Sequence, residues 1–352
     1  MQNRIFGIDL LRSIILVFGP TIHASMLMDG AFGFEGFLSQ STWLRNIFYI
    51  SNQLRMELFF LISGFFSSLL IAKKSESYFI FSRKQKVLIP TVFSLVSIVP
   101  ITFLLIYFLQ GKTDLDYAIS YRHIWFLVAL SIISLLACIS PNKITKLSMY
   151  LAKFKNSKNI IAGLIPLILI VFLFEAMSRT SNYLLHPKLL QSLQLGPVLK
   201  FFGYYICGMA IYFWKESPRR SMITSGILMF ALWYLLKCAY DVEYKWFFSI
   251  TKPAITVIAC LSIFYSFTGI KDPGITALNK ISELAFPFYL LHLPLLIIIS
   301  SAWFYLSGSK SDILYSIIVI PIDIAVTYYC AKLLIRSNFI RKSLGLTNLK
   351  YN

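Results

Sequence analysis

The chain has 352 residues, of which 57% are hydrophobic and 14% charged, and its mean hydropathy is +0.72. A soluble core of this length cannot enclose so much apolar surface, so the composition excludes an ordinary soluble protein and indicates a membrane as the solvent. The net charge of +18 does not indicate nucleic-acid binding, because the basic residues fall in alternate loops rather than in one stripe or arm.

Ten apolar runs are long enough to cross about 30 Å of hydrocarbon. They predict an all-α integral membrane protein, built as a single bundle of about ten transmembrane helices, with one membrane-embedded domain over residues 1–352. The expected spans are Ile8–Met28, Leu54–Ala72, Val87–Leu109, His123–Ile139, Ile160–Met177, Val198–Trp214, Met222–Ala239, Pro253–Thr268, Leu284–Phe304 and Ile313–Ile335.

The distribution of lysine and arginine predicts the orientation of these spans. Basic residues gather after the second, fourth, sixth and last spans, whereas the intervening loops are nearly balanced in charge. The positive-inside rule places the basic loops, and with them both termini, on the cytoplasmic side. The five cysteines form no CxxC pair and show no metal-ligand spacing, so we expect no metal site.

The first span carries three ionisable residues, Asp9, Arg12 and His23. A charge at membrane depth costs at least about 2.5 kcal/mol, so each one is a functional candidate. Arg12 and His23 are separated by about 1100° of helix and about 16 Å of rise, and therefore share one face, with Arg12 near the cytoplasm and His23 in the outer half. A salt bridge between Asp9 and Arg12 that only sets the topology is the alternative for that pair.

The second span carries Glu57 at a depth similar to that of His23. A carboxylate beside an imidazole fixes its tautomer and raises its basicity, which suits a general base that takes a proton from a hydroxyl. Pairing of Glu57 with Arg55, or contact with lipid headgroups, is the alternative without a catalytic role.

Two further places in the sequence combine histidine with an aromatic residue. His123 and Trp125 open the fourth span, where an aromatic belt at the membrane surface would also explain them. His292 lies near the middle of the ninth span, with Tyr289 one turn earlier and Pro287 expected to kink the helix. His292 is therefore a candidate for function.

Taken together and in their order along the chain, the motifs of this sequence resemble those of the membrane-bound acyltransferase family 3, and the resemblance covers nearly the whole chain. The resemblance rests on Arg12 and His23 with ten residues between them, on LFFLISGFF at Leu58–Phe66, on FSRKQKVLIP and on YLLH at Tyr289–His292. The segments RMELFFLISGFF and HIWFL are most similar to those of the glucan biosynthesis protein C branch, which succinylates periplasmic glucans.

The resemblance implies an O-acyltransferase of the bacterial cytoplasmic (inner) membrane. Its co-substrate would be cytoplasmic acyl-CoA, with acetyl and succinyl both open, and its acceptor a hydroxyl of an extracytoplasmic glycan such as a periplasmic glucan, a lipopolysaccharide or another surface polysaccharide. No bound cofactor and no nucleic acid are expected. The partners are the acyl-CoA, the glycan and the lipid bilayer, and a homo-oligomer is left open.

The resemblance also assigns roles to residues. Arg12, Arg83 and Lys86 would hold the phosphates of coenzyme A, although Lys86 stands where arginine is usual and weakens bidentate recognition. His23, oriented by Glu57, would act as general base or become transiently acylated. The remaining substrate-binding candidates are His123, Trp125, Tyr289 and His292, and either of the last two is a candidate to stabilise the oxyanion.

Buried histidine, glutamate and arginine also occur in proton relays, so a proton-coupled secondary transporter is the main rival function. A transporter often shows internal repeats, and the sequence has none that we can detect. A purely structural role is a third alternative, which the number of intramembrane ionisable residues disfavours.

Overall fold

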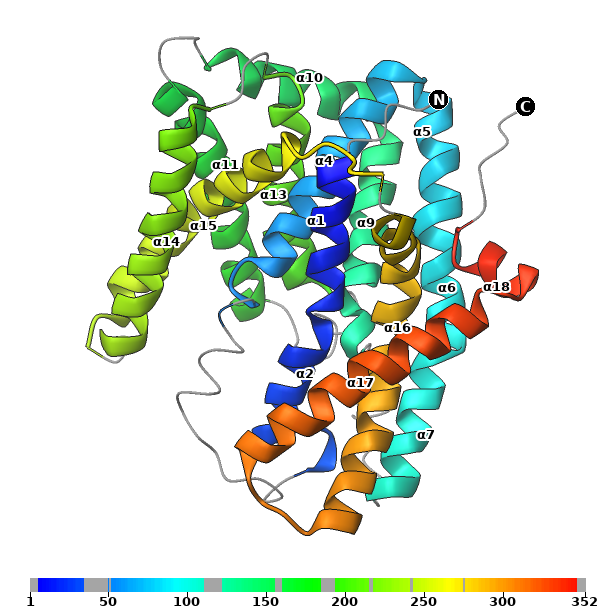
Figure 1. The fold of residues 1–352 in the computed structure, drawn as a ribbon. Coiled ribbons are helices and arrows are strands. Elements are labelled where there is room, and N and C mark those ends of the chain that lie inside the picture. Colours follow the sequence, from blue (N-terminus) through cyan, green and yellow to red (C-terminus); the bar gives the residue numbers. More distant parts are fainter. Residues whose placement is uncertain are drawn as a thin grey trace. The chain divides into compact units, whose positions relative to one another are not determined.

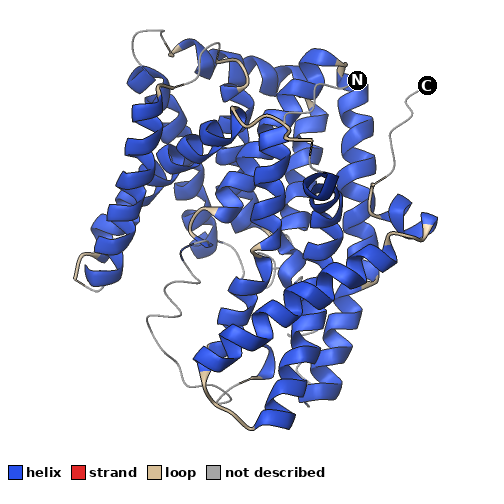
Figure 2. Cartoon of the chain, in the orientation of Figure 1, coloured by secondary structure: helices blue, strands red, loops and turns tan. Residues whose placement is uncertain are grey.

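The computed structural model describes residues 6–34, 50, 52–110, 122–155, 160–184, 194–214, 218–240, 243–274 and 276–346. These residues form helices joined by short turns and loops, and no strand occurs among them (Figure 2). Figure 1 follows the helices along the chain: α1 Phe6–Val17, α2 Gly19–Met28, η1 Ala31–Gly33, α4 Arg55–Lys73, α5 Glu76–Arg83, the π-helix η2 Lys84–Leu88, α6 Ile89–Val96, α7 Ile98–Gln110, η3 Arg122–Ile124, α9 Trp125–Ile139, α10 Pro141–Lys153, α11 Ile160–Leu184, α13 Leu195–Ile211, α14 Arg220–Tyr240, α15 Lys245–Thr268, α16 Thr276–Ser307, α17 Asp312–Leu334 and α18 Asn338–Ser343.

In the described part of the chain, eight helical segments are long and apolar enough to cross a membrane. They coincide with eight of the ten expected spans, which confirms an all-α membrane protein. The expected fourth span is the first arm of a bent pair, α9 and α10, which meet at 96° and would add a ninth crossing if they form one span. The expected sixth span is α13, a shorter apolar helix of 17 residues.

The helices divide into two compact units. Unit 1 comprises residues 1–11, 53–83 and 129–273, and unit 2 comprises residues 12–52, 84–128 and 274–352. Each unit is described by itself below.

In unit 1, α4 and α13 pack with their backbones in close contact. A Cβ atom at Gly64 would lie 1.9 Å from the carbonyl oxygen of Tyr205, and one at Gly208 would lie 1.8 Å from that of Leu61. Ser68 adds a hydrogen bond from its hydroxyl to the carbonyl oxygen of Met209, at 3.0 Å. Small residues permit this approach in membrane helices, where packing rather than water exclusion holds helices together. The space beside Gly64 is therefore filled by a helix.

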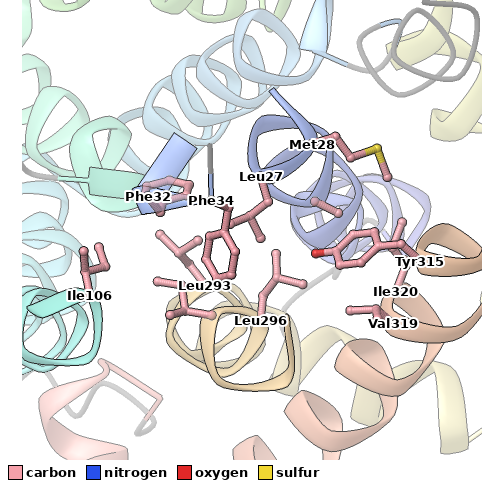
Figure 3. Close-up of a cluster of buried hydrophobic side chains, with 12 residues drawn as sticks. Leu27, Met28, Phe32, Phe34, Ile106, Leu293, Leu296, Tyr315, Val319 and Ile320 are labelled. Carbon is pink, nitrogen blue, oxygen red and sulfur yellow. The ribbon is translucent and has the colours of Figure 1, made fainter. Parts of the chain in front are cut away.

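Unit 2 is built around α16, which packs against α2, α7 and α17. Figure 3 shows the buried apolar side chains that these helices and the segment after α2 direct toward one another. Tyr315 of α17 lies in this core and shares a hydrogen bond of 2.7 Å with the hydroxyl of Ser300. The twelve core residues are Ala24, Leu27, Met28, Phe32, Phe34, Ile106, Leu293, Leu296, Ile297, Tyr315, Val319 and Ile320.

The first span is broken at Phe18, between α1 and α2. Pro20 has no N–H to donate to the carbonyl of Leu16, so the helical ladder is interrupted there. The separation of about 1100° and about 16 Å between Arg12 and His23 applies to an unbroken helix, and the turn at Phe18 interrupts the helix between these two residues.

Candidate active site

Three of the four histidines of the chain meet in unit 2. His23 comes from α2, His123 from η3 and His292 from α16. Their ring centroids are 5.0 Å apart for His23 and His292, 5.2 Å for His123 and His292, and 6.0 Å for His23 and His123. All three side chains are buried. We call them the histidine cluster.

Gly19 allows α2 to approach the cluster. A Cβ atom at this position would lie 3.1 Å from Nε2 of His292 and 3.2 Å from its Cε1. Gly19 precedes His23 by one helical turn, so the two residues lie on a similar face of α2. The absence of a side chain at Gly19 is what lets the His292 ring lie against this helix.

Tyr289 and His292 are fixed by hydrogen bonds to backbone oxygens. The hydroxyl of Tyr289 donates to the backbone carbonyl of His123, and Nδ1 of His292 contacts the backbone carbonyl of Tyr289. Because a carbonyl oxygen only accepts, Nδ1 of His292 carries the hydrogen and Nε2 holds the lone pair of the neutral ring. The Tyr289 hydroxyl therefore has a positioning role for His123.

His123 is held by α16 at its ring as well as at its backbone. Its Nε2 lies 3.0 Å from the carbonyl oxygen of Leu290, and its ring centroid lies 5.6 Å from that of Tyr289. Trp125, two residues later, begins α9 and is half-buried. His123, expected at the outer end of the fourth span, has a buried side chain and lies in the histidine cluster.

Glu57, the expected partner of His23, lies in unit 1 and forms an ion pair with Lys200. Its Oε1 is 2.6 Å from Nζ of Lys200, on α13. The Glu57 side chain is 3% exposed and that of Lys200 23% exposed. His23 belongs to unit 2, so the orientation of His23 by Glu57 stays a prediction, and the alternative partner Arg55 is replaced by Lys200.

The expected spans contain further charged residues besides those singled out above, and two of them, Lys200 and Asp323, lie in the interior of their helices. Lys200 interrupts the apolar run of the sixth span, and Asp323 interrupts that of the tenth. The Asp323 side chain is fully buried and lies 3.2 Å from the hydroxyl of Thr327. Both residues carry the signal that identified His23, namely an ionisable group at membrane depth.

Arg83 lies in a hydroxyl network of unit 1. Its guanidinium nitrogens lie 2.9 Å from Oγ of Ser67 and 3.5 Å from Oγ of Ser63, both on α4. Ser67 also accepts a hydrogen bond of 2.7 Å from the hydroxyl of Tyr205. The guanidinium stacks on the ring of Phe79 at 5.2 Å. Arg83 is thus buried among helices, and its role toward coenzyme A stays a prediction.

The other two candidates for phosphate binding belong to unit 2. Arg12 is half-buried on α1, and Lys86 is exposed on the π-helix η2. A single turn of π-helix is frequent at functional sites, because it shifts the register of the side chains that follow. Within the described residues, no group of three or more histidine, cysteine, aspartate or glutamate side chains could hold a metal ion.

Comparison with known proteins gives a consistent set of relatives. The chain is 22% identical over 290 residues to "Glucans biosynthesis protein C" of Shigella dysenteriae serotype 1 (strain Sd197), Escherichia coli (strain K12) and Escherichia coli O9:H4 (strain HS). Each alignment covers 75% of this chain and 74% of the relative. No solved structure matches the chain.

The profile of the acyltransferase 3 family, described as an acyltransferase domain, matches residues 5–332 and so spans both units. This match favours an enzyme over the transporter and scaffold alternatives. It also agrees with the multi-pass helical architecture. The chain therefore belongs to the acyltransferase 3 family and is a membrane acyltransferase.

Proposed function

We propose that the chain transfers an acyl group from cytoplasmic acyl-CoA to a hydroxyl group of an extracytoplasmic glycan, across the cytoplasmic membrane of a bacterium. The name of the relatives supports a glucan as the acceptor. The loops rich in lysine and arginine support cytoplasmic termini. The donor is acetyl-CoA or succinyl-CoA.

The histidine cluster is the observation that carries this proposal. Acyl transfer to a hydroxyl needs a base at the attacking oxygen, and imidazole has the pKa that suits a base near neutral pH. Three imidazoles buried within 6.0 Å of one another are costly in a membrane unless they are used. His23 is the member that also follows the Arg12 motif at the family's spacing.

In the proposed reaction, the hydroxyl oxygen of the glycan attacks the thioester carbonyl carbon, and His23 takes the hydroxyl proton. The new carbon–oxygen bond forms, the carbon–sulfur bond breaks, and coenzyme A leaves as a thiolate that takes up a proton. Transfer by way of a transiently acylated His23 is the second route open to the same residue.

His292 is also a candidate to stabilise the oxyanion. Its Nε2 atom holds the lone pair of the neutral ring and therefore accepts a hydrogen bond rather than donating one.

Arg12 and Lys86 are proposed to bind the phosphates of coenzyme A on the cytoplasmic side. Arginine gives a planar pair of donors that fits a phosphate, whereas lysine gives a point charge. Arg12 lies on α1 and His23 on α2, the two halves of the first span, and both belong to unit 2. The first span would then join the phosphate end of the donor to its thioester end.

The test uses purified protein in proteoliposomes, with acyl-CoA on one side and a periplasmic glucan on the other. Mass spectrometry of the glucan measures transfer, and acetyl-CoA and succinyl-CoA are compared in parallel. The proposal predicts acylated glucan only when acyl-CoA faces the side of the termini. Transfer with both substrates on the side opposite the termini would contradict the proposed orientation, and no consumption of either thioester would contradict the proposed donor.

A further inference from the structure

Helix α16 contains two prolines, Pro287 and Pro294. In an α-helix, the N–H of each residue donates to the carbonyl four residues earlier, and proline has no N–H. Pro294 therefore leaves the carbonyl of Leu290 without its helical donor, and Pro287 does the same for Glu283. Inside a membrane, a freed carbonyl has to find another donor, because no bulk water is present to supply one.

His123 supplies the donor to Leu290. Its Nε2 lies 3.0 Å from the Leu290 oxygen, and an oxygen that only accepts requires the hydrogen to be on Nε2. In the neutral ring, the lone pair is then on Nδ1. This Nδ1 atom is buried, and within the described part of the chain it has no hydrogen-bond partner. The contact with Leu290 thus selects a tautomer whose proton-accepting atom is available.

Consecutive residues of α16 fix both the backbone and the ring of His123. Tyr289 donates its hydroxyl proton to the His123 backbone carbonyl, and Leu290 accepts from the ring. Since both anchors are on one helix, the ring has little freedom to rotate. It is held at 6.0 Å from the ring of His23, between centroids, with the two planes 82° apart.

We propose that Pro294 is a positioning residue for acyl transfer, because the carbonyl it frees at Leu290 holds His123 in the tautomer whose Nδ1 shares the transferred proton with His23. This inference rests on the proposed function. The hydroxyl proton passes from the imidazolium of His23 to Nδ1 of His123, directly or through one water, which returns His23 to its neutral form. The proton finally reaches the thiolate of coenzyme A, which leaves as a thiol.

The substitution His123→Gln separates the hydrogen bond from the base. The glutamine amide N–H can replace the Nε2–H donor to Leu290, but the amide oxygen accepts only a hydrogen bond and is not basic enough to take up a proton as Nδ1 can. We expect the variant to keep its melting temperature and its KM for acyl-CoA, while kcat falls by about 10- to 100-fold. Unchanged kcat in a folded His123→Gln protein would overturn the role of His123 as a base.

The substitution Pro294→Ala restores an N–H that competes with His123 for the Leu290 carbonyl. We expect kcat to fall by at least about tenfold with KM unchanged. Pro287→Ala is the matched control, since it removes a proline from the same helix and restores the bond to Glu283, and it should change kcat by less than about twofold. Equal losses in the two variants would contradict a specific role for Pro294.

Because Pro294 acts through His123, the two effects should not add. Pro294→Ala introduced into His123→Gln should lower kcat no further, whereas independent effects would multiply. An additive double variant would overturn the inference.

Nuclear magnetic resonance of protein labelled with nitrogen-15 at histidine gives a readout that does not depend on activity. The signals of His123, identified by their loss in His123→Gln, should place the hydrogen on Nε2 in the parent protein and shift toward the other tautomer in Pro294→Ala. An unchanged tautomer in Pro294→Ala would overturn the inference and leave the proposed function intact. Absence of acyl transfer in the parent protein, with the tautomer shift observed, would instead contradict the proposed function.

Discussion

Glu57 of α4 and Lys200 of α13 form an ion pair of 2.6 Å inside unit 1. The ammonium of Lys200 also lies 4.7 Å from the centroid of the Phe201 ring, which in turn stacks on Phe60. The two helices are therefore joined by a charge pair near the start of α4 and by glycine contacts farther along. The Glu57 carboxylate, which the sequence predicts to orient His23, is thus paired with the ammonium of Lys200.

Removal of one member of this pair should destabilise the protein strongly. In Lys200→Met, the Glu57 carboxylate stays buried without its counter-ion, and the loss should be about 3–5 kcal/mol. Glu57→Gln combined with Lys200→Met should recover part of that loss, because neither charge remains. Thermal unfolding in detergent measures both, and a double variant less stable than Lys200→Met would contradict the assignment.

Gly64→Ala and Gly208→Ala should each destabilise the protein by at least about 1–3 kcal/mol. In both cases, the added methyl group would meet a backbone carbonyl that cannot rotate away. Gly269→Ala is the matched control, because its Cβ would meet nothing within 4 Å, and it should be close to neutral. The melting temperatures of the three variants test this prediction. An equal decrease in melting temperature for Gly269→Ala would argue against the close packing of α4 and α13.

Gly19→Ala should lower turnover without unfolding unit 2. The added Cβ would lie 3.1 Å from Nε2 of His292, so the ring has to move by a fraction of an ångström. Small misplacements of reacting groups can cost up to about 100-fold in rate, and we expect a loss of about 10-fold. Steady-state kinetics of glucan acylation measures this loss. An unaltered kcat would contradict the prediction that turnover depends on the position of the His292 ring.

Arg83→Ala should weaken binding of acyl-CoA more than His23→Ala does. A lost hydrogen bond between a guanidinium and a phosphate costs about 1.5–3 kcal/mol, which corresponds to about 10- to 150-fold in Kd. Titration of the purified variants with acyl-CoA compares them directly, and Ser67→Ala controls for the loss of the neighbouring hydroxyl contact. The reverse order of affinities would contradict the predicted role of Arg83 toward coenzyme A.

The sequence was sufficient to predict most of the helices, because long apolar runs have few alternatives to spanning helices. It was not sufficient where local backbone events decide the geometry. Ser140-Pro141 starts a new helix at 96° to the preceding one, and a hydropathy pattern does not contain that angle. Similarly, the turn at Phe18 divides the first span into α1 and α2, and a hydropathy pattern does not locate that turn.

The candidate site could be predicted residue by residue but not as an arrangement. His23, His123 and His292 each stood out as a histidine in or beside an apolar run, whereas their convergence depends on how α2, η3 and α16 pack. Lys200 lies in an apolar run whose length predicts a span, and its ion pair with Glu57 depends on the packing of α4 against α13. The sequence shows that Pro294 frees the Leu290 carbonyl, but the contact of that carbonyl with His123 depends on the tertiary structure.

The most direct measurement compares the parent protein with His23→Ala in proteoliposomes that contain acyl-CoA on the side of the termini and glucan on the other. With equal amounts of folded protein in the membrane, we expect glucan acylation to fall by at least about 100-fold in His23→Ala, as for the loss of a general base. Binding of acyl-CoA should stay within about threefold, which is below 1 kcal/mol. Unchanged acylation in the folded variant would contradict the assignment of His23 and with it the central claim.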